Sequence, residues 1–442
     1  MAFTKHDVEE LSSAHGEPSW LREARLAAWE RFEATPMPDS SKDEDWRRTD
    51  ISKLDLGAFT PSLNGANTPA LNVQDAPLEV GQGEGEGPLP PGVIFCSLEE
   101  AVRRCPDLVR EHLAEHEGKL LALNAALWSG GAFVYVPPDI EVEVPLVASY
   151  GETDGASAFF PRTLVVVDRG ASLVYIDCFG GDQPSSLLSG KRQGPAGSSG
   201  GGPDSALSTQ HSALSSASTH LVVKDGGRLA YVSLQERGSG TWHFSTERAV
   251  ISRDAKADLV IAALGSYLSK SYVETILSGP GGEANLLGLV LTDGQQHIDH
   301  QTLQEHLAPH TTSNLLLKSA VKGHSQSIFA GLVRMPKEAQ QSDAFQEARA
   351  LLLSEHAKAD AIPKLEIIAN DVRCTHAGAI GQVDAEQRFY LMSRGIPEDE
   401  AERLIVTGFF EPALERIPVE TVRESTRKAL AARLAPTPAG QT

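Results

Sequence analysis

The densest group of titratable side chains in the sequence is a histidine-rich run, QHIDHQTLQEHLAPH. Its imidazoles and carboxylates belong to His297, Asp299, His300, Glu305, His306 and His310. Imidazole binds zinc, iron, nickel and copper well, so the run could form the metal site of a β-fold enzyme. On a strand, successive side chains point to opposite faces, which would separate His297 from His300. A polar strand face with hydrogen-bonded imidazoles is therefore the competing interpretation.

A second candidate site is the segment Cys374-Thr375-His376, which follows the apolar run from Leu365 to Ile368. Two residues apart on an extended backbone, the thiol and the imidazole would share one face. They could ligate iron or receive an iron–sulfur cluster. Because a cluster usually has four protein ligands, the other ligands would have to come from another chain. The alternative is an ordinary buried cysteine beside a surface histidine.

Several common catalytic motifs are absent from the sequence. It contains no GxxxxGK[ST] phosphate loop, no HExxH zinc motif and no GxGxxG between a strand and a helix. Its cysteines form no CxxC pair, which excludes a ribbon-type zinc site and a thioredoxin-like motif. We therefore do not expect the chain to hydrolyse ATP by a phosphate-loop mechanism.

Short apolar runs separated by turn residues repeat through the middle of the chain. The runs that begin at Leu221, Ala249 and Thr275 are spaced by 28 and 26 residues, and each precedes a turn and a second apolar run. Repetition at this period is typical of solenoids and propellers. No Trp-Asp signature of a propeller occurs, so the pattern favours a parallel β-helix, in which each coil buries its inner face against its neighbours. A large β-sandwich is the alternative.

Helical patterns flank this repeat, so the predicted fold class is mainly β with α-helical regions at both ends. Residues 1–126 are predicted to form an N-terminal helical region with a linker, 127–383 the β-helix core and 384–442 a C-terminal helical domain. Residues 180–218 are rich in glycine and serine. Such a segment cannot bury enough apolar surface to become ordered, which predicts a flexible insertion within the core.

The composition restricts the partners and the location of the chain. Its 442 residues include 59 acidic and 39 basic ones, for a formal net charge of −20. This charge is unsuited to non-specific binding of nucleic acid or of anionic membranes. No apolar run approaches the length of a membrane span, and the first ten residues lack the apolar region of a signal peptide. We therefore expect a cytoplasmic protein.

Six segments, in a fixed order along the chain, carry a family resemblance. They are EPSWL from Glu17, EDWRRTD from Glu44, LNAALWSGGAFVYVP from Leu123, DHQTLQEHLAPHTTS from Asp299, LEIIANDVRCTHAGAIG from Leu365 and RFYLMSRGIPEDEAERLIVTGF from Arg388. In these segments the chain resembles the SufB/SufD family of the SUF iron–sulfur cluster assembly system. SufB-like chains carry a cysteine near the position of Leu391 and lack the Cys374–His376 arrangement, so the resemblance is stronger to the SufD side of the family.

The resemblance implies a right-handed parallel β-helix in a complex with a SufB-like paralogue and a SufC-like ABC ATPase. This chain would be a non-catalytic subunit, with ATP hydrolysis in the partner. The resemblance also implies that His376, with Cys374 beside it, contributes to a transient iron–sulfur cluster shared between two β-helices. ATPase docking is expected on the C-terminal helices, at Arg394, Gly395, Ile396, Leu404 and Phe409. A flavin in the complex and a homodimer of the isolated chain are also compatible with it.

Overall fold

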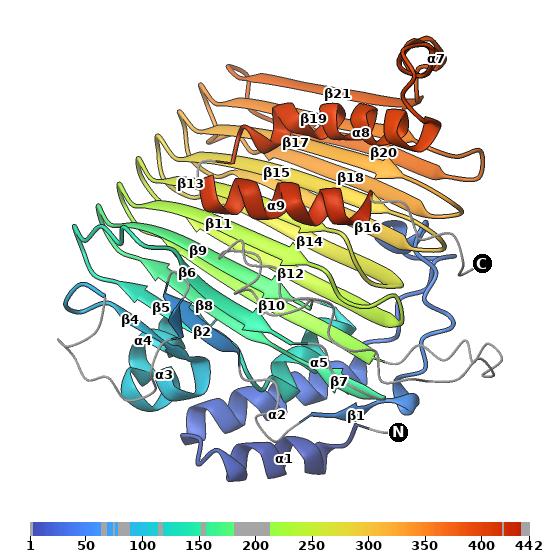
Figure 1. Cartoon of the computed structure of the whole chain (residues 1–442). Coiled ribbons are helices and arrows are strands. Elements are labelled where there is room, and N and C mark those ends of the chain that lie inside the picture. The colour runs from blue at the N-terminus through green and yellow to red at the C-terminus, as the bar shows by residue number, and fades with distance from the viewer. Residues whose placement is uncertain are drawn as a thin grey trace.

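A parallel β-solenoid of about seven turns forms the core of the chain in the computed structural model, with helices at both ends (Figure 1). The structure describes residues 3–62, 69–73, 76–77, 89–113, 118–151, 156–180, 213–417 and 420–434. Residues 181–212 of the predicted insertion at 180–218 lie outside these residues, and its predicted end lies too late in the chain, because residues 213–218 are the buried start of a strand that begins at Ala213. The mainly β fold class and the parallel β-helix are confirmed, and the β-sandwich alternative is wrong, because consecutive turns pair through parallel strands.

Each full turn contributes one strand to each of two sheets. The first sheet contains Ile94–Ser97 (β4), Ala132–Val136 (β5), Arg162–Val167 (β8), Ala213–Val223 (β10), Thr241–Ile251 (β12), Leu268–Leu277 (β14), His297–His306 (β16), Gln326–Met335 (β18) and Lys358–Ile367 (β20). The second contains Ala70–Val73 (β2), Ala76–Pro77 (β3), Leu146–Tyr150 (β6), Ser172–Phe179 (β9), Arg228–Gln235 (β11), Lys256–Ala263 (β13), Glu283–Thr292 (β15), Thr312–Val321 (β17), Asp343–Leu352 (β19) and Arg373–Gln382 (β21). Two short strands, Thr60–Pro61 (β1) and Ser157–Phe159 (β7), pair beside the first sheet.

The strands are apolar on both faces because both faces are covered. Leu286 and Leu315 are register partners on neighbouring strands and point into the lumen. Leu287 and Leu316, one residue further along, pack outward beneath the C-terminal helices. A parallel strand that is buried on both sides reads as a nearly continuous apolar run, which is the pattern that the sequence shows.

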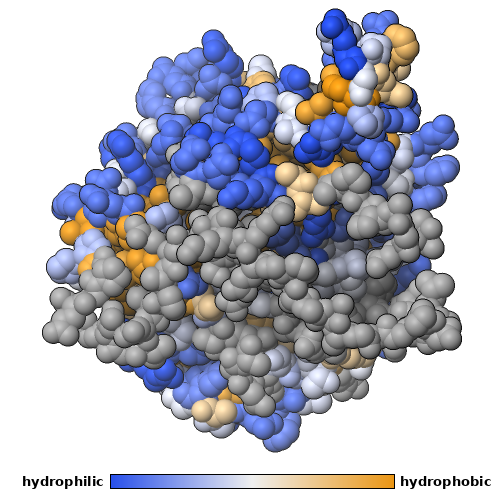
Figure 2. Space-filling model, in the orientation of Figure 1, coloured by the Kyte–Doolittle hydropathy of each residue, from blue (hydrophilic) through white to orange (hydrophobic). Residues whose placement is uncertain are grey.

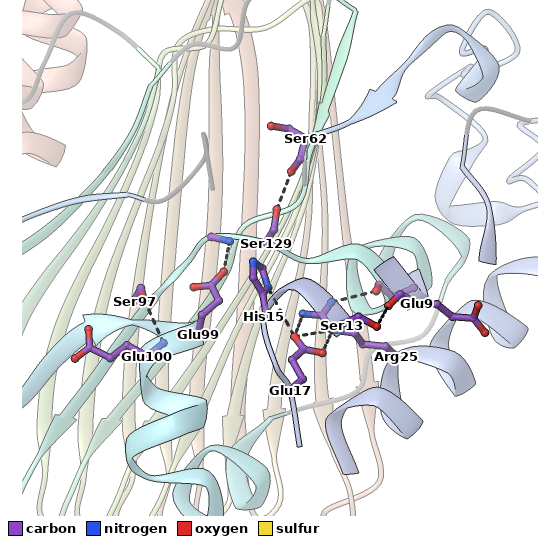
Figure 3. A network of polar contacts seen from close by, with 12 residues as sticks. Glu9, Ser13, His15, Glu17, Arg25, Ser62, Ser97, Glu99, Glu100 and Ser129 are labelled. Atoms are coloured by element: carbon purple, nitrogen blue, oxygen red, sulfur yellow. Dashed lines mark hydrogen bonds and ion pairs between the residues drawn. The ribbon is translucent and has the colours of Figure 1, made fainter. Parts of the chain in front are cut away.

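Helices at the N-terminal end of the solenoid pack against the outer face of the first sheet. They are Lys5–Ala14 (α1), Ser19–Ala34 (α2), Leu98–Arg104 (α3), Pro106–His112 (α4) and Lys119–Leu127 (α5), with short 3-10 turns at Glu44–Trp46 (η1) and Leu56–Ala58 (η2). The guanidinium of Arg25, fully buried, donates to Glu17 at 2.7 Å and to the carbonyl of Ala126 at 3.1 Å (Figure 3). It also lies 4.2 Å from the ring of Trp128. This buried cation is therefore paired, and it joins α2 to the start of the solenoid.

Residues 44–50, here called the N-terminal strap, run along the outer face of the first sheet. Lys270 is fully buried, and its ammonium donates to the carbonyl of Asp45 at 2.7 Å and to the carboxylate of Asp299 at 2.5 Å. The hydroxyl of Thr49 donates to the same carboxylate at 2.5 Å. A buried ion pair thus holds the strap on β14 and β16.

The C-terminal helices are Ala385–Ser393 (α7), Glu398–Leu414 (α8) and Glu420–Arg433 (α9). Helices α8 and α9 lie across the outer face of the second sheet, and α7 projects from the end of the solenoid (Figure 1). Val406, Phe410 and Leu414 of α8 are buried against the outward leucines of the sheet. Within the described ranges, no helix combines the length and the hydropathy needed to cross a membrane.

The lumen near the N-terminal end encloses two carboxyl groups. Asp177 accepts hydrogen bonds from the hydroxyls of Tyr175 at 2.6 Å and Tyr231 at 3.1 Å, and burial raises its pKa to about 7. Glu247 accepts a long hydrogen bond from the hydroxyl of Ser245, at 3.4 Å. Burial raises the pKa of Glu247 to about 8. At neutral pH Glu247 is therefore mostly protonated, which avoids an unpaired buried charge.

The raised pKa of Glu247 predicts a pH-dependent stability. The folded state holds this proton more tightly than the unfolded state, so the stabilisation is complete below about pH 4.5 and is lost as the pH rises through 8. In the wild type, this proton makes the free energy of unfolding fall by about 1.4 kcal/mol per pH unit between pH 5.5 and 7.5. Glu247→Gln should remove this fall. Urea unfolding at several pH values measures the difference. Glu355→Gln, at an exposed turn, is the control; equal pH dependence in Glu247→Gln and the wild type would contradict the prediction.

The buried ion pair of the strap predicts a large effect of removing one charge. Lys270→Met leaves the carboxylate of Asp299 buried without its cation, and the free energy of unfolding should fall by about 3–5 kcal/mol. Limited proteolysis should then cut within residues 44–50. Arg48→Ala removes an exposed pair with Asp360 at 3.6 Å and should cost less than about 1 kcal/mol. Equal destabilisation by the two substitutions would show that the buried pair does not hold the strap.

Candidate metal site at the open end of the solenoid

The last turn of the solenoid is open. Among the described residues, β20 pairs only with β18 and β21 only with β19, so one edge of each strand carries free backbone groups. Apolar side chains that continue the inner columns are left uncovered, and Leu365, Ile367 and Ile380 are 38–46% exposed. Exposed strand edges and exposed apolar surface of this kind are typical of a protein interface.

Cys374 and His376 lie in this open turn, on the inner face of β21. Cys374 is the register partner of Ala344, and His376 is the register partner of Gln346. Ala344 and Gln346 are both buried on the inner face of β19. Because stacked parallel strands repeat the same facing, the thiol and the imidazole point toward the lumen where it meets solvent.

The two side chains differ in exposure. Cys374 is half-buried beside Val333, Met335 and Ala344, whereas His376 is exposed. Burial raises the pKa of the Cys374 thiol, and the nearby carboxylate of Asp343 raises it further. The thiol is therefore protonated at neutral pH, and it becomes a metal ligand only when a metal or a cationic partner displaces its proton.

The histidine-rich run does not form one site. His297 lies on the outer face of β16, where its Nε2 is 3.0 Å from the hydroxyl of Thr49. His300 lies on the opposite, inner face and is fully buried. His310 lies in an exposed turn after the strand, with a positive φ of 59°. The strand thus separates the imidazoles, as its two-residue periodicity predicts.

The remaining histidine of the run is also bound within the fold. The ring of His306 bonds the hydroxyls of Thr311 at 2.7 Å and Ser313 at 2.8 Å. Burial lowers the pKa of both His300 and His306 to about 4, so both are neutral core side chains. Within the described part of the chain, no three His, Cys, Asp or Glu side chains lie together as a metal site. The metal-dependent enzyme that we considered for this run therefore lacks its site.

The predicted docking residues lie around α7 and α8. Hydrophobic side chains gather on the projecting α7, and Phe389 and Tyr390 are 73% and 56% exposed (Figure 2). Arg394 lies over the ring of Tyr390, 5.0 Å from its centroid, at the end of this helix. Gly395 follows with a positive φ of 84°, which allows the sharp turn into α8. Leu404 is exposed on α8.

Ile396 and Phe409 are less accessible than the other predicted docking residues. Ile396 is partly buried in the turn between the two helices. Phe409 packs against the sheet: its carbonyl accepts a hydrogen bond from Lys318 at 2.5 Å, and the ammonium lies 4.8 Å from its ring. The exposed surface of this region is therefore formed by α7 and the first half of α8, while Phe409 anchors α8 to β17.

One residue beside the open turn was missed by the sequence analysis. Gln346 is fully buried on the inner face of β19, directly beneath His376 in the register. The signal in the sequence is a glutamine between Ala344 and Ala348, at a lumen position where the two preceding turns carry leucine. That signal becomes visible only once the register of the strands is known.

Comparisons with known proteins agree with this arrangement. Residues 204–409 match the family model of the SufBD core domain of SUF system FeS cluster assembly, and residues 72–147 match the SufBD protein N-terminal region. The iron–sulfur cluster assembly protein SufD of Bacillus subtilis is 30% identical over 94% of this chain and 94% of its own length. SufB of the same organism is 29% identical over 96% and 92%. A SufBD family protein of Staphylococcus epidermidis is 27% identical over 96% and 92%. The chain belongs to the SufB/SufD family of iron–sulfur cluster assembly proteins.

Proposed function

We propose that the chain is a SufD-type subunit that helps to form or load a nascent iron–sulfur cluster together with a SufB-like partner. The observation that carries the proposal is the open last turn, where Cys374 and His376 share the inner face of a strand that has no described neighbour along one edge. A thiol and an imidazole are two of the ligand types that iron–sulfur clusters accept. Two further ligands would come from the chain that covers this end.

A second β-solenoid is the partner that fits this end. The free edges of β20 and β21 can pair with the strands of another sheet, which would satisfy their backbone groups. The exposed Leu365, Ile367 and Ile380 would then be buried against its apolar inner residues. A SufB-like paralogue offers such an end, and a homodimer of the isolated chain would use the same surface. A cluster held there would be transient and shared between the two chains.

The SufD assignment is supported by the residues of the site and not by overall identity. The chain is almost equally identical to the SufB and the SufD of Bacillus subtilis. The Cys374–His376 pair supports the SufD side, and so does Leu391, because an aliphatic side chain cannot ligate a metal. In such a complex this chain would supply ligands and an interface, without catalysis of its own.

The exposed α7 and the first half of α8 would dock a SufC-like ABC ATPase. Phe389 and Tyr390 on α7 and Leu404 on α8 are exposed large hydrophobic side chains, and aromatic residues are common centres of protein interfaces. The absence of a phosphate loop from this chain agrees with ATP hydrolysis in the partner. We place the complex in the cytoplasm. A flavin bound to the complex stays a prediction from the family resemblance.

The ligand role of His376 is tested by substitution in the full complex. His376→Ala should slow cluster formation by at least about tenfold, because one ligand of the shared site is lost. His356→Ala, another exposed histidine of this chain, should leave the rate unchanged. The rate is measured from the visible absorbance of the cluster under anaerobic conditions with iron and a sulfur donor. A normal rate in the His376→Ala complex would contradict the ligand role.

The docking surface is tested by placing charges on it. Tyr390→Glu and Leu404→Glu should each weaken binding of the purified ATPase by about 10–100-fold, since a desolvated carboxylate opposes an apolar contact. Leu307→Glu is the matched control, because Leu307 is as exposed as Leu404 but lies in a turn after β16. Calorimetry on the full chain measures the affinity. Binding by both variants that equals that of the control would place the ATPase elsewhere.

A further inference from the structure

Gln346 is a buried amide without a hydrogen-bond partner. Its side chain is fully buried, and neither its Nε2 nor its Oε1 bonds any atom of the described chain. A buried amide in this state has lost its hydrogen bonds to water and gained none in return, which destabilises the fold. Such a group in a native structure calls for an explanation, and a functional role is one of those that are found.

The opposite sheet leaves space for this amide because it carries a glycine at the facing position. Gly331 lies across the lumen on β18, and a Cβ added there would lie 2.0 Å from the Nε2 of Gln346. Any side chain at position 331 would therefore displace the amide. The ring of Phe329 lies beside the same point, 2.6 Å from that added Cβ. Glycine at 331 thus allows the carboxamide to extend across the lumen just below the open turn.

His376 is the next residue in the same column. It is the register partner of Gln346, on a strand about 4.8 Å away, and both side chains face the lumen. The side chains on either side of His376 on the inner face of β21 provide no strong acceptor: Gly378 has no side chain, and the Cys374 thiol is a weak acceptor. The carboxamide oxygen of Gln346 is a strong acceptor, and it belongs to the residue next to His376 in the same column.

We propose that Gln346 is a positioning residue for His376, whose ring N–H it binds through its carboxamide oxygen. Metal-binding histidines generally donate their second ring N–H to such an acceptor, which fixes the tautomer and the direction of the ring. With one ring nitrogen held by Gln346, the other is free to bind a metal at the open end. The inference rests on the proposed ligand role of His376 and adds the group that orients it.

The inference is tested by measuring which tautomer of the His376 ring is populated. In full-length chain labelled with ¹⁵N-histidine, at a pH where the imidazoles are neutral, the ring nitrogen shifts report which nitrogen carries the proton. The resonance of His376 is identified by its loss in His376→Asn. Wild type should show one dominant tautomer, and Gln346→Met, which keeps the length of the side chain, should change the tautomer ratio at least fivefold. Equal ratios in the two proteins would overturn the inference.

A matched control separates positioning from packing. Gln304→Met changes another buried lumen glutamine, which bonds Ser313 on β17, and it should leave the His376 tautomer unchanged. Gln346→Met should keep or raise the thermal midpoint, because it removes an unpaired buried amide. If the methionine does not fit, Gln346→Leu gives the same comparison. A change of the His376 tautomer by Gln304→Met as large as that by Gln346→Met would also overturn the inference.

Binding of Co²⁺ by the same variants separates this inference from the proposed function. Gln346→Met should weaken Co²⁺ binding about 10–100-fold, and His376→Ala should weaken it at least as much. If His376→Ala binds Co²⁺ like the wild type, the ligand role of His376 is wrong, while the tautomer ratio still decides whether Gln346 positions the ring. If His376→Ala loses Co²⁺ and Gln346→Met has the wild-type affinity and tautomer, the proposed function stands and Gln346 has no part in it.

Discussion

The in-register stacking of parallel strands is the constraint on which the rest of this structure depends. Because each turn repeats the register of the turn before it, every inner position belongs to a column that runs along the lumen. A residue is therefore surrounded by the residues at its own position in the neighbouring turns. Leu286, Leu315, Gln346 and His376 form one such column, which changes from apolar to polar as it approaches the open end.

The same constraint distinguishes the two ends of the solenoid from its middle, because the inner columns stop there. An inner column needs a cover where it stops, and at the N-terminal end the antiparallel strands β2 and β4 provide one, with Val73 and Phe95 packed in the lumen core beside Leu146 and Val134. At the C-terminal end the described chain provides none, and the uncovered positions include Cys374 and His376. The energetic cost of leaving apolar and backbone groups in water favours association at this end, so the proposed interface and the candidate ligands occupy the same place for one physical reason.

Much of the fold could be predicted from the sequence because a solenoid is a local repeat. The apolar runs from Leu221 onward show the turns, and the two-residue periodicity correctly separates His297 from His300. The strap could not be predicted, since Thr49 and Asp299 are 250 residues apart and no local pattern links them. The open edge of the last turn could not be predicted either. Strand periodicity indicates the side on which His376 points, but it does not indicate whether another turn covers it.

The position of α7 joins the two proposed surfaces of the chain. Strand β21, which carries His376, ends at Gln382, and α7 begins at Ala385 with Asp384 as its N-cap. Helix α8 is in turn held to the outer face of the sheet by Lys318, on β17, and by the pair of Lys322 with Glu402 at 2.9 Å. A force applied to α7 by a docked ATPase would therefore reach β21 through two residues of backbone, while the contacts of α8 keep the rest of the sheet in place. Since β21, like β20, has one neighbouring strand among the described residues, fewer backbone hydrogen bonds restrain it than the strands between two neighbours, and motion there would change the surroundings of His376 directly.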